Sequence, residues 1–586
     1  MNTSTTCLSA SYLPTLMTYM TSLISEHSDT LPPVHLHSGD HFDFIVVGAG
    51  SAGCVVANRL SEITGWSVLL LEAGGEEPAT TQVPAFLPYS FGSPIDWGYR
   101  TEKQTKSCGG HECYWPRGKV LGGTSALNAM IYNRGNSHDY DHWAEQGNTG
   151  WSYKDVLPYF KKSENNMDPD IANNTKYHST GGYLSVQRYP YLEKNAKAIH
   201  EAFRELGYNG IDFNTETHTG VMFAQATQEN GERRSTNKAF IEPIRHKRAN
   251  LKVVPNVRVT KILIHPENKT AYGVEYANEI DRSETGRVFA SKEIVLSAGA
   301  VNSPQLLMLS GIGLKETLEP LGIHVIQELN VGRNLQDHFS APGVFFTLNE
   351  KARALPSNEE ILIDSVKYSK AKRDGPWATV AASGTCAKVS TRYANHSIDN
   401  PDFQLIFTTH SSCAETKMPI CYYDEINFHS TLLRPKSRGY VTINTTDPFV
   451  QPLIYPNYFT APEDVDATLE SYNIAIQLGN TKALKDAGFV LNASFVPTKE
   501  DFESGNNPLW EPYAWYSFHH QSGTCKMGPS SDSAAVVDPQ LKVHGIHGLR
   551  VADASIMPFV TSGNTNAPCI MIGEKVSDMI KNSWDH

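Results

Sequence analysis

The chain has 586 residues, more than one compact core usually holds, so its length predicts two or more folding units. A formal net charge of −12 and a pI near 6.0 argue against nucleic acid as a partner, because binding a phosphate backbone needs an excess of Lys and Arg. No apolar run reaches the roughly 18 to 20 residues that cross a bilayer, so no membrane span is expected.

Residues 1–41 are predicted to be a leader or signal region. The stretch 13–24 is apolar but is interrupted by Thr and Pro, and no Lys or Arg occurs before Arg59. An atypical signal peptide and an untethered tail therefore explain this segment about equally well. Export as a secreted glycoprotein is favoured by five Asn-x-Ser/Thr sequons after residue 41, at Asn173, Asn268, Asn395, Asn444 and Asn492.

The nine cysteines also favour an oxidising compartment. Cys108 and Cys113 flank a short Gly-Gly-His-Glu loop and are predicted to form a disulfide. Cys413 and Cys421 could pair likewise. The odd total leaves at least one thiol free or paired between molecules. Cys54 lies in a predicted helix and is expected to act as a small buried apolar residue.

The strongest local pattern starts at Phe42, where FDFIVV is typical of a central parallel strand buried on both faces. The segment GAGSAG follows directly and supplies Gly48, Gly50 and Gly53. The next residues, AGCVVANRLSE, predict a helix, and WSVLLLEAGG predicts a second apolar strand that ends at Glu72. Strand, Gly-rich turn, helix, strand and acid together form a dinucleotide-binding fingerprint.

Each part of this fingerprint has a physical reason. Gly48 allows a tight turn, Gly50 lets the backbone approach a pyrophosphate, and Gly53 lets the helix lie close to the strand. The N-terminus of the helix offers amide donors to the phosphates. Glu72, at the end of the second strand, can accept hydrogen bonds from both ribose hydroxyls, which disfavours a 2′-phosphate. The fingerprint alone does not separate NAD from FAD.

Motifs later in the chain distinguish FAD from NAD. The stretch YWPRGKVLGGTSALNAMIYNRG begins at Tyr114 and contains a second Gly turn at Gly122 and Gly123. GAVNSPQLLMLSGIG covers residues 299–313, and Ser303 with the following Pro is expected to start a helix under the cofactor. The motifs VGRNLQDH, HHQSGTCKMG, LRVADASIMP and NTNAPCIMIGEK follow in that order toward the C-terminus.

These motifs, in this order over residues 42–580, resemble those of the glucose–methanol–choline (GMC) oxidoreductases. The sequence CYWPRGKVLGG, with DWGYRTE before it, is most similar to the arthropod glucose-dehydrogenase-like and alcohol-oxidase-like branch. The resemblance implies an α/β fold, α+β overall, with a Rossmann-like FAD-binding domain and a discontinuous substrate domain built on an antiparallel sheet.

The resemblance also implies the domain ranges. The FAD-binding domain is expected to comprise residues 42–185, 225–340 and 515–586, and the substrate-binding domain residues 186–224 and 341–514. Within the latter, FQLIFTTH and RGYVTINTT have the patterns of strands, whereas EDVDATLESYNIAIQLGNTKAL has helical spacing.

Oxidation of an alcohol to a carbonyl needs a base for the hydroxyl proton beside the hydride acceptor, and histidine suits this role near neutral pH. The family supplies it from a His-x-x-Gly-Thr segment, which places the base at His520 here. His519 is the rival candidate. The resemblance places a second polar residue at Asn564, whose amide can donate a hydrogen bond to a developing alkoxide but cannot act as a base. Asn566 is close enough in the sequence to be confused with it.

The family resemblance implies non-covalent FAD, because Leu127 stands where some relatives attach the flavin through a histidine. No metal is expected. The cofactor contacts implied by the resemblance and the fingerprint are Gly48, Gly50, Ser51, Ala52, Gly53, Glu72, Ala73, Trp97, Val120, Gly123, Thr124, Asn128, Ala129, Met130, Ile131, Val259, Asp553, Ala554, Asn564 and Thr565.

The predicted activity is oxidation of an aromatic or allylic alcohol, a cyanohydrin or a sugar, with hydride transfer to flavin and dioxygen as the expected acceptor. The alternatives are an FAD-dependent glucose dehydrogenase with a quinone-type acceptor and a non-catalytic secreted flavin-binding relative. Four aromatic residues are equally compatible with the substrate pocket and with the core: Trp377, Tyr513, Trp515 and Phe518.

Overall fold

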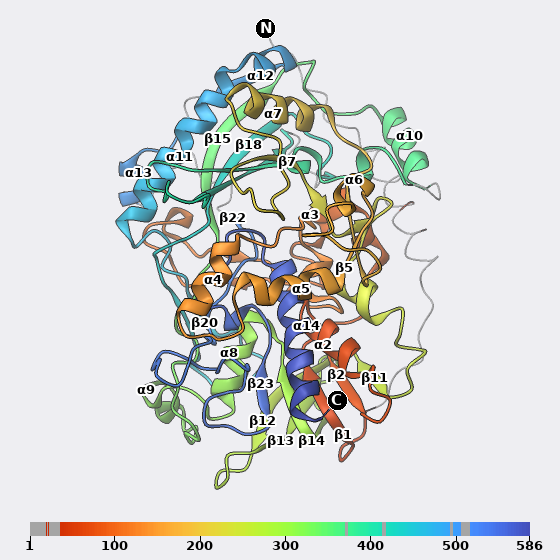
Figure 1. Ribbon diagram of the computed structural model, residues 1–586, viewed down its shortest axis with the longest axis vertical. Coiled ribbons are helices and arrows are strands. Elements are labelled where there is room, and N and C mark those ends of the chain that lie inside the picture. The colour runs from red at the N-terminus through yellow and green to blue at the C-terminus, as the bar shows by residue number, and fades with distance from the viewer. Residues whose placement is uncertain are drawn as a thin grey trace.

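The computed structural model describes residues 19, 22, 36–369, 373–412, 418–492, 496–504 and 516–585. Cys413, Tyr513, Trp515 and most of the leader therefore lie outside the described residues. Two large β-sheets dominate the fold, one toward each end of the long axis, with helices packed around them (Figure 1). Across the described part of the chain, no helix is long and apolar enough to cross a membrane.

The lower sheet in Figure 1 contains the strands that the Gly-rich segment predicted. Its strand order is β11, β2, β1, β14, β13, β12, and β23 also pairs with β14. The last four residues of β1 and all of β2 are buried, which explains why both are continuous apolar runs. The strands are β1 (His41–Val47), β2 (Val68–Leu71), β11 (Leu251–Val254), β12 (Val257–Ile264), β13 (Ala271–Asn278), β14 (Thr285–Leu296) and β23 (Leu549–Val551).

Strand β14 joins distant parts of the chain. Its first half runs antiparallel to β13, and its second half is parallel to both β1 and β23. The helices α2 (Gly53–Leu60) and α14 (Asn566–Ser583) pack against each other beside this sheet. Segments near the start and the end of the described chain therefore form one folding unit.

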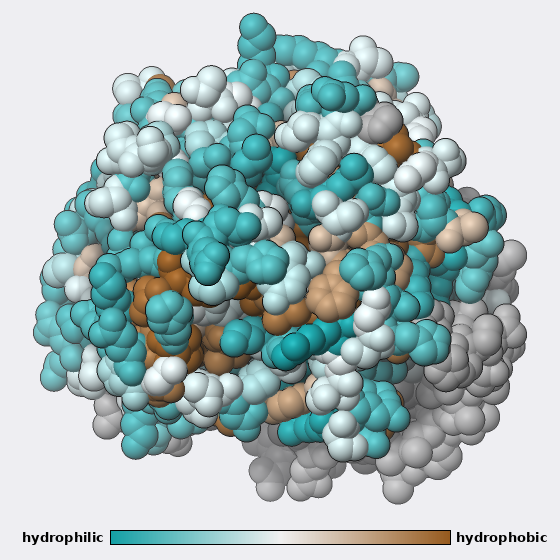
Figure 2. Space-filling model, turned by 90° about the horizontal axis from the view of Figure 1, so that it is seen from below, coloured by the Kyte–Doolittle hydropathy of each residue, from teal (hydrophilic) through white to brown (hydrophobic). Residues whose placement is uncertain are grey.

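Seen from below, hydrophilic residues cover most of the surface, and hydrophobic side chains show in smaller areas between them (Figure 2).

The upper sheet is antiparallel, as expected, with strand order β21, β15, β18, β17, β16, β7, and β22 paired to one end of β15. The helices α7 (Lys194–Glu205) and α11 (Pro462–Asn480) pack on it. The strands are β7 (Gly220–Phe223), β15 (Phe339–Leu348), β16 (Thr385–Val389), β17 (Phe403–His410), β18 (Glu425–Leu432), β21 (Phe489–Asn492) and β22 (Tyr516–Ser517).

Shorter elements connect the two sheets. The remaining α-helices are α3 (Leu87–Ser90), α4 (Ser137–Glu145), α5 (Tyr153–Ser163), α6 (Pro169–Ala172), α8 (Gly299–Leu309), α9 (Lys315–Leu318), α10 (Asn358–Tyr368), α12 (Lys482–Ala487) and α13 (Lys499–Ser504). The short strands are β3 (Tyr99–Arg100), β4 (Tyr114–Trp115), β5 (Glu164–Asn166), β6 (Leu184–Arg188), β8 (Gln225–Ala226), β9 (Gln228–Glu229), β10 (Glu232–Arg233), β19 (Tyr440–Thr442) and β20 (Leu453–Tyr455).

The prediction that Ser303 starts a helix is wrong by one turn. Helix α8 begins at Gly299 and contains Pro304. A proline inside a helix leaves the carbonyl four residues earlier without its donor. Here that carbonyl belongs to Ala300, and it accepts a hydrogen bond of 2.7 Å from the Thr524 hydroxyl. A side chain from a distant segment thus allows the helix to start earlier than the local sequence indicates.

Two other predicted elements differ in detail. The long helical pattern that begins at Glu463 forms two helices, α11 and α12, because Thr481 is extended and its hydroxyl caps the second helix through the backbone N–H of Leu484. The strand predicted in RGYVTINTT is only β19, which pairs with β20 in a separate two-stranded sheet. FQLIFTTH coincides with β17, as expected.

The cysteines divide as follows. Cys108 and Cys113 form the predicted disulfide, with Cα atoms 5.6 Å apart. Cys54 is fully buried in α2, as expected for a small apolar residue. The suggested pairing of Cys421 is not supported, because Cys421 is a free buried thiol, and Cys413 lies outside the described residues.

Replacing Arg550 with Leu is expected to destabilise the fold by about 3–5 kcal/mol, because it leaves a buried carboxylate unpaired. Arg550 on β23 is fully buried and forms two hydrogen bonds, of 2.5 and 3.0 Å, with Glu293 on β14. The matched control is R287L, since Arg287 lies on β14 in an exposed pair with Glu275 and should contribute less than about 1 kcal/mol. Urea unfolding measures both; equal effects would contradict this assignment.

Candidate active site

The Gly-rich turn after β1 brings three backbone segments close together. Gly48 has φ +98°, and a Cβ atom there would lie 2.5 Å from the carbonyl oxygen of Ser297 at the end of β14. A Cβ atom on Gly53 would lie 1.9 Å from the Gly48 carbonyl oxygen. A Cβ atom on Gly50 would meet nothing within 4 Å. Gly48 and Gly53 therefore permit close packing, whereas Gly50 leaves space open.

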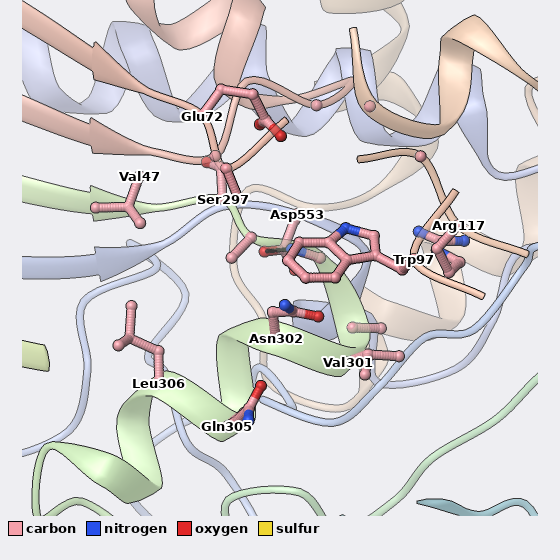
Figure 3. Close-up of a pocket in the computed structure, with 18 of the residues that line it drawn as sticks. Val47, Glu72, Trp97, Arg117, Ser297, Val301, Asn302, Gln305, Leu306 and Asp553 are labelled. Atoms are coloured by element: carbon pink, nitrogen blue, oxygen red, sulfur yellow. Dashed lines mark hydrogen bonds between the residues drawn. The ribbon is translucent and has the colours of Figure 1, made fainter. Parts of the chain in front are cut away.

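That open space belongs to a first cavity, of about 140 Å³, at the carboxyl ends of β1 and β2. Residues at the N-terminal end of α2 line it, so the positive end of this helix dipole faces the cavity, and residues along one side of α8 line it as well. Figure 3 shows Glu72 near the strand ends and Val301, Asn302 and Gln305 projecting from α8, with the ring of Trp97 between them.

Two buried carboxylates line this cavity. Glu72 accepts hydrogen bonds of 2.8 Å from the backbone N–H groups of Ala49 and Gly74, which fix it across the Gly-rich turn. Burial raises the pKa of Glu72 to about 7, and these two hydrogen bonds oppose the rise. Asp553 accepts from the backbone N–H of Gly299 and the hydroxyl of Ser303, and so caps the first turn of α8.

A second cavity, of about 330 Å³, adjoins the first. The two share a set of lining residues, Ser51, Arg117, Thr124, Ala554 and Cys569. His520 and Asn564 line the second cavity on one side, and residues 128–131 line it as well. The two cavities therefore connect the Gly-rich turn with the predicted base.

The imidazole of His520 is held on both sides. Its Nδ1 lies 3.0 Å from Nδ1 of His338, and its Nε2 lies 3.3 Å from Nδ2 of Asn564. The side-chain oxygen of Asn564 accepts a hydrogen bond of 3.2 Å from Gln404 on β17. Burial, with the nearby His338, His519 and Arg117, lowers the pKa of His520 well below its usual value. The ring is therefore neutral at neutral pH.

The two rival residues have different surroundings. His519 has φ +62° and its ring packs 5.6 Å from that of Phe91, while its carbonyl accepts a hydrogen bond from Arg117. It lines the cavity but has no described contact with Asn564. Asn566 accepts a hydrogen bond of 2.7 Å from the Ser51 hydroxyl at the start of α14. The geometry thus brings His520, and neither His519 nor Asn566, into contact with Asn564.

Most predicted cofactor contacts line one of the two cavities. Gly53 and Val120 do not: Gly53 packs against the turn, and Val120 is fully buried. Phe518 lines the second cavity, whereas Trp377 is a core residue that donates a hydrogen bond to the hydroxyl of Tyr422. The first cavity contains Gly48, Gly50, Ser51, Ala52, Glu72, Ala73, Trp97, Gly123, Thr124, Val259, Asp553 and Ala554, and the second contains Ser51, Thr124, Asn128, Ala129, Met130, Ile131, Ala554, Asn564 and Thr565.

Three residues near the site were not predicted. Arg117 lies at the junction of the cavities and donates hydrogen bonds to the His519 carbonyl and to the side-chain oxygen of Gln521. His338 and Gln404 contact the predicted pair from the antiparallel sheet side. Arg117 and His338 lie within motifs already singled out, WPRGKV and VGRNLQDH, but nothing local indicates which side chains they touch.

Comparison with known protein families shows to which family the chain belongs. The model of the GMC oxidoreductase N-terminal region matches residues 42–340, and that of the C-terminal region matches residues 435–573. The chain belongs to the GMC oxidoreductase family. This GMC oxidoreductase is 44% identical to glucose dehydrogenase [FAD, quinone] of Drosophila melanogaster, over 93% of this chain and 87% of the relative.

Two further relatives place the protein within the family. Ecdysone oxidase of Bombyx mori is 35% identical, over 94% of this GMC oxidoreductase and 83% of the relative, which supports the arthropod branch. The crystal structure of pyridoxine 4-oxidase from Mesorbium loti is 28% identical and superimposes with a TM-score of 0.78, over 93% of this chain and 99% of that one. The expected fold, a Rossmann-like domain with an antiparallel-sheet domain, is confirmed.

Replacing Gly50 with Val is expected to leave the protein folded but to weaken FAD binding by more than about tenfold, or about 1.4 kcal/mol. A Cβ atom at this position would have no protein atom within 4 Å, and Gly50 lines the first cavity, so the new side chain would occupy space needed by the cofactor. Gly65→Val is the matched control, because Gly65 is exposed in the loop after α2 and also has open space around it. Flavin absorbance after reconstitution, titrated with FAD, measures the effect; equal affinities would contradict the role of Gly50.

Proposed function

We propose that this protein oxidises an alcohol CH–OH group to a carbonyl and transfers the hydride to a bound FAD. The observation that carries the proposal is the joined pair of cavities, with the Gly-rich turn and Glu72 in one and the His520–Asn564 pair in the other. A merely structural flavin-binding relative would have no need for a neutral buried histidine facing the second cavity.

The residues present fit an FAD. The N-terminus of α2 and the open side of Gly50 suit a pyrophosphate, and the Glu72 carboxylate suits ribose hydroxyls. FAD supplies the two-electron acceptor for the hydride. Leu127, which is fully buried, offers no nucleophile for a covalent flavin link, so we propose non-covalent binding. The proposed cofactor contacts are those residues predicted from the sequence that line either of the two cavities.

The proposed mechanism assigns one role to each side chain of the pair. Nε2 of His520 accepts the proton of the substrate hydroxyl. Nδ2 of Asn564 donates a hydrogen bond to the oxygen that becomes negatively charged, because an amide N–H can stabilise an alkoxide without exchanging its proton. His520 is buried and Asn564 is half-buried, so little water reaches the pair, which strengthens these interactions. The low pKa of His520 keeps Nε2 available as an acceptor at neutral pH.

The lining of the second cavity favours an alcohol with an apolar body. Among its described residues there is no Asp or Glu. Carboxylates are strong acceptors for the many hydroxyl groups of a sugar, whereas apolar walls suit aromatic or other hydrophobic groups. Its larger apolar side chains, which lie among Ser, Thr and Asn residues, are Leu87, Phe91, Met130, Ile131, Ile406, Met418, Ile420 and Phe518. We propose an aromatic or allylic alcohol as the substrate and dioxygen as the acceptor.

Glucose oxidation with a quinone acceptor is the second candidate. It is favoured by the 44% identity to the Drosophila melanogaster glucose dehydrogenase. Anaerobic addition of benzyl alcohol and of glucose to the purified yellow protein separates the two. We expect benzyl alcohol to bleach the flavin and air to restore the colour. Bleaching by glucose alone would support the second candidate, and bleaching that persists in air until a quinone is added would exclude dioxygen as the acceptor.

We also propose secretion, glycosylation and a division into two domains. Four of the five sequon asparagines are exposed, which supports glycosylation. The proposed FAD-binding domain comprises residues 42–185, 225–340 and 515–586, and the substrate-binding domain residues 186–224 and 341–514. The strands of the two large sheets follow this division with two exceptions: β15 crosses the proposed boundary at residue 340, and β22 lies in the range 515–586 but pairs with β15 in the antiparallel sheet.

Replacing His520 with Gln is expected to slow flavin reduction by about 10²–10⁴-fold, because the variant lacks the base. The flavin should remain bound, since the substitution lies in the second cavity. The matched control is H519N, since asparagine tolerates the positive φ of His519, and its rate should fall by less than about tenfold. Anaerobic rapid mixing measures both rates. A larger loss in H519N than in H520Q would assign the base to His519 instead.

A further inference from the structure

A second buried histidine lies directly behind His520. His338 immediately precedes β15 and is fully buried. Its Nε2 lies 3.0 Å from the carbonyl oxygen of Leu433, and its Nδ1 lies 3.0 Å from Nδ1 of His520. Burial lowers the pKa of His338 to about 4, so this ring is neutral at neutral pH. A neutral imidazole has one donor and one acceptor nitrogen.

The Leu433 carbonyl determines which nitrogen of His338 carries the hydrogen. A carbonyl oxygen only accepts, so Nε2 of His338 must donate to it, and Nδ1 of His338 is then an acceptor. The partner of that acceptor, Nδ1 of His520, must therefore be the protonated nitrogen. Since His520 is also neutral, its single hydrogen lies on Nδ1 and its Nε2 is unprotonated.

The hydrogen bonds on the other side of the His520 ring indicate the same tautomer. Gln404 donates from its amide nitrogen to the side-chain oxygen of Asn564, which orients the Asn564 NH₂ group toward Nε2 of His520. An NH₂ group only donates, so Nε2 must accept. In the opposite tautomer of His520, two lone pairs would face each other 3.0 Å apart at His338, and two donors would face each other 3.3 Å apart at Asn564.

We propose that His338 is a positioning residue that fixes the tautomer of His520, so that Nε2 is the unprotonated nitrogen on the side of Asn564. This inference rests on the proposed function in taking His520 as the base. When Nε2 accepts the substrate proton, Nδ1 keeps its own hydrogen and continues to donate to His338. The ring therefore gains its positive charge without rotating, as in other sites where a third group orients a catalytic histidine. Only Nε2 exchanges its hydrogen-bond partner, from the Asn564 NH₂ group to the substrate oxygen.

Two amide substitutions at position 338 separate the two hydrogen bonds of His338. H338N can place an acceptor oxygen near the position of Nδ1 but is too short to reach the Leu433 carbonyl. H338Q can place its NH₂ group near the position of Nε2 but leaves Nδ1 of His520 without its acceptor. We expect kcat for flavin reduction to fall by less than about tenfold in H338N and by about 100-fold in H338Q. KM should change little in either variant.

Flavin content and thermal unfolding of both variants show whether each is folded. Equal losses of kcat in H338N and H338Q, or a greater loss in H338N, would overturn the proposal, because the hydrogen bond to Leu433 would then be the one that matters.

A neutron crystal structure of the wild-type protein tests the tautomer without any variant. We expect deuterium on Nδ1 of His520 and on Nε2 of His338, and none on Nε2 of His520. Deuterium on Nε2 of His520 would overturn the inference even if alcohols bleach the flavin. If no alcohol bleaches the flavin while deuterium lies on Nδ1, the proposed function fails and the tautomer assignment stands.

Discussion

A short backbone ladder between residues 336–340 and 516–522 determines the geometry of the site. Gln336 and Ser522 exchange backbone hydrogen bonds of 2.8 and 2.9 Å, and at the other end Phe339 pairs with Ser517. Between these pairs, His519 has φ +62°, which interrupts the regular alternation of side chains. His520 is therefore able to face His338 across the ladder, while the ring of His519 lies beside Phe91.

The same ladder connects the two large sheets. Its upper end continues into β15 of the antiparallel sheet, and its lower end leads to Thr524, whose hydroxyl bonds the Ala300 carbonyl in α8. His520, the proposed base, is thus fixed between α8, which lines the first cavity, and the antiparallel sheet, which contributes to the lining of the second. Hydrogen bonds from Arg117 to the His519 carbonyl and to Gln521 add a third connection, from the strand-and-turn segment after β4. A buried site with this many connections can hold a neutral base at a constant distance from its partners.

Local patterns in the sequence were sufficient for the parts of the site that depend on backbone geometry. Gly48 and Gly53 are required by contacts between neighbouring segments, and Glu72 ends a short apolar strand, so fold and cofactor class could be predicted. The roles of His338 and Gln404 could not be predicted, because they depend on contacts with residues 182 and 160 positions away in the sequence. The start of α8 was missed for the same reason, since the Thr524 hydroxyl that compensates for Pro304 comes from a distant segment.

Flavin reduction in this protein is proposed to remove the hydrogen bound to the substrate carbon while His520 holds the hydroxyl proton. Anaerobic rapid mixing with benzyl alcohol and with its α-dideuterated form tests this claim most directly. We expect the visible flavin absorbance to disappear several times more slowly with the deuterated alcohol, and the product to be benzaldehyde. Equal rates would mean that cleavage of this bond does not limit flavin reduction, and bleaching without formation of an aldehyde would contradict hydride transfer from the alcohol carbon.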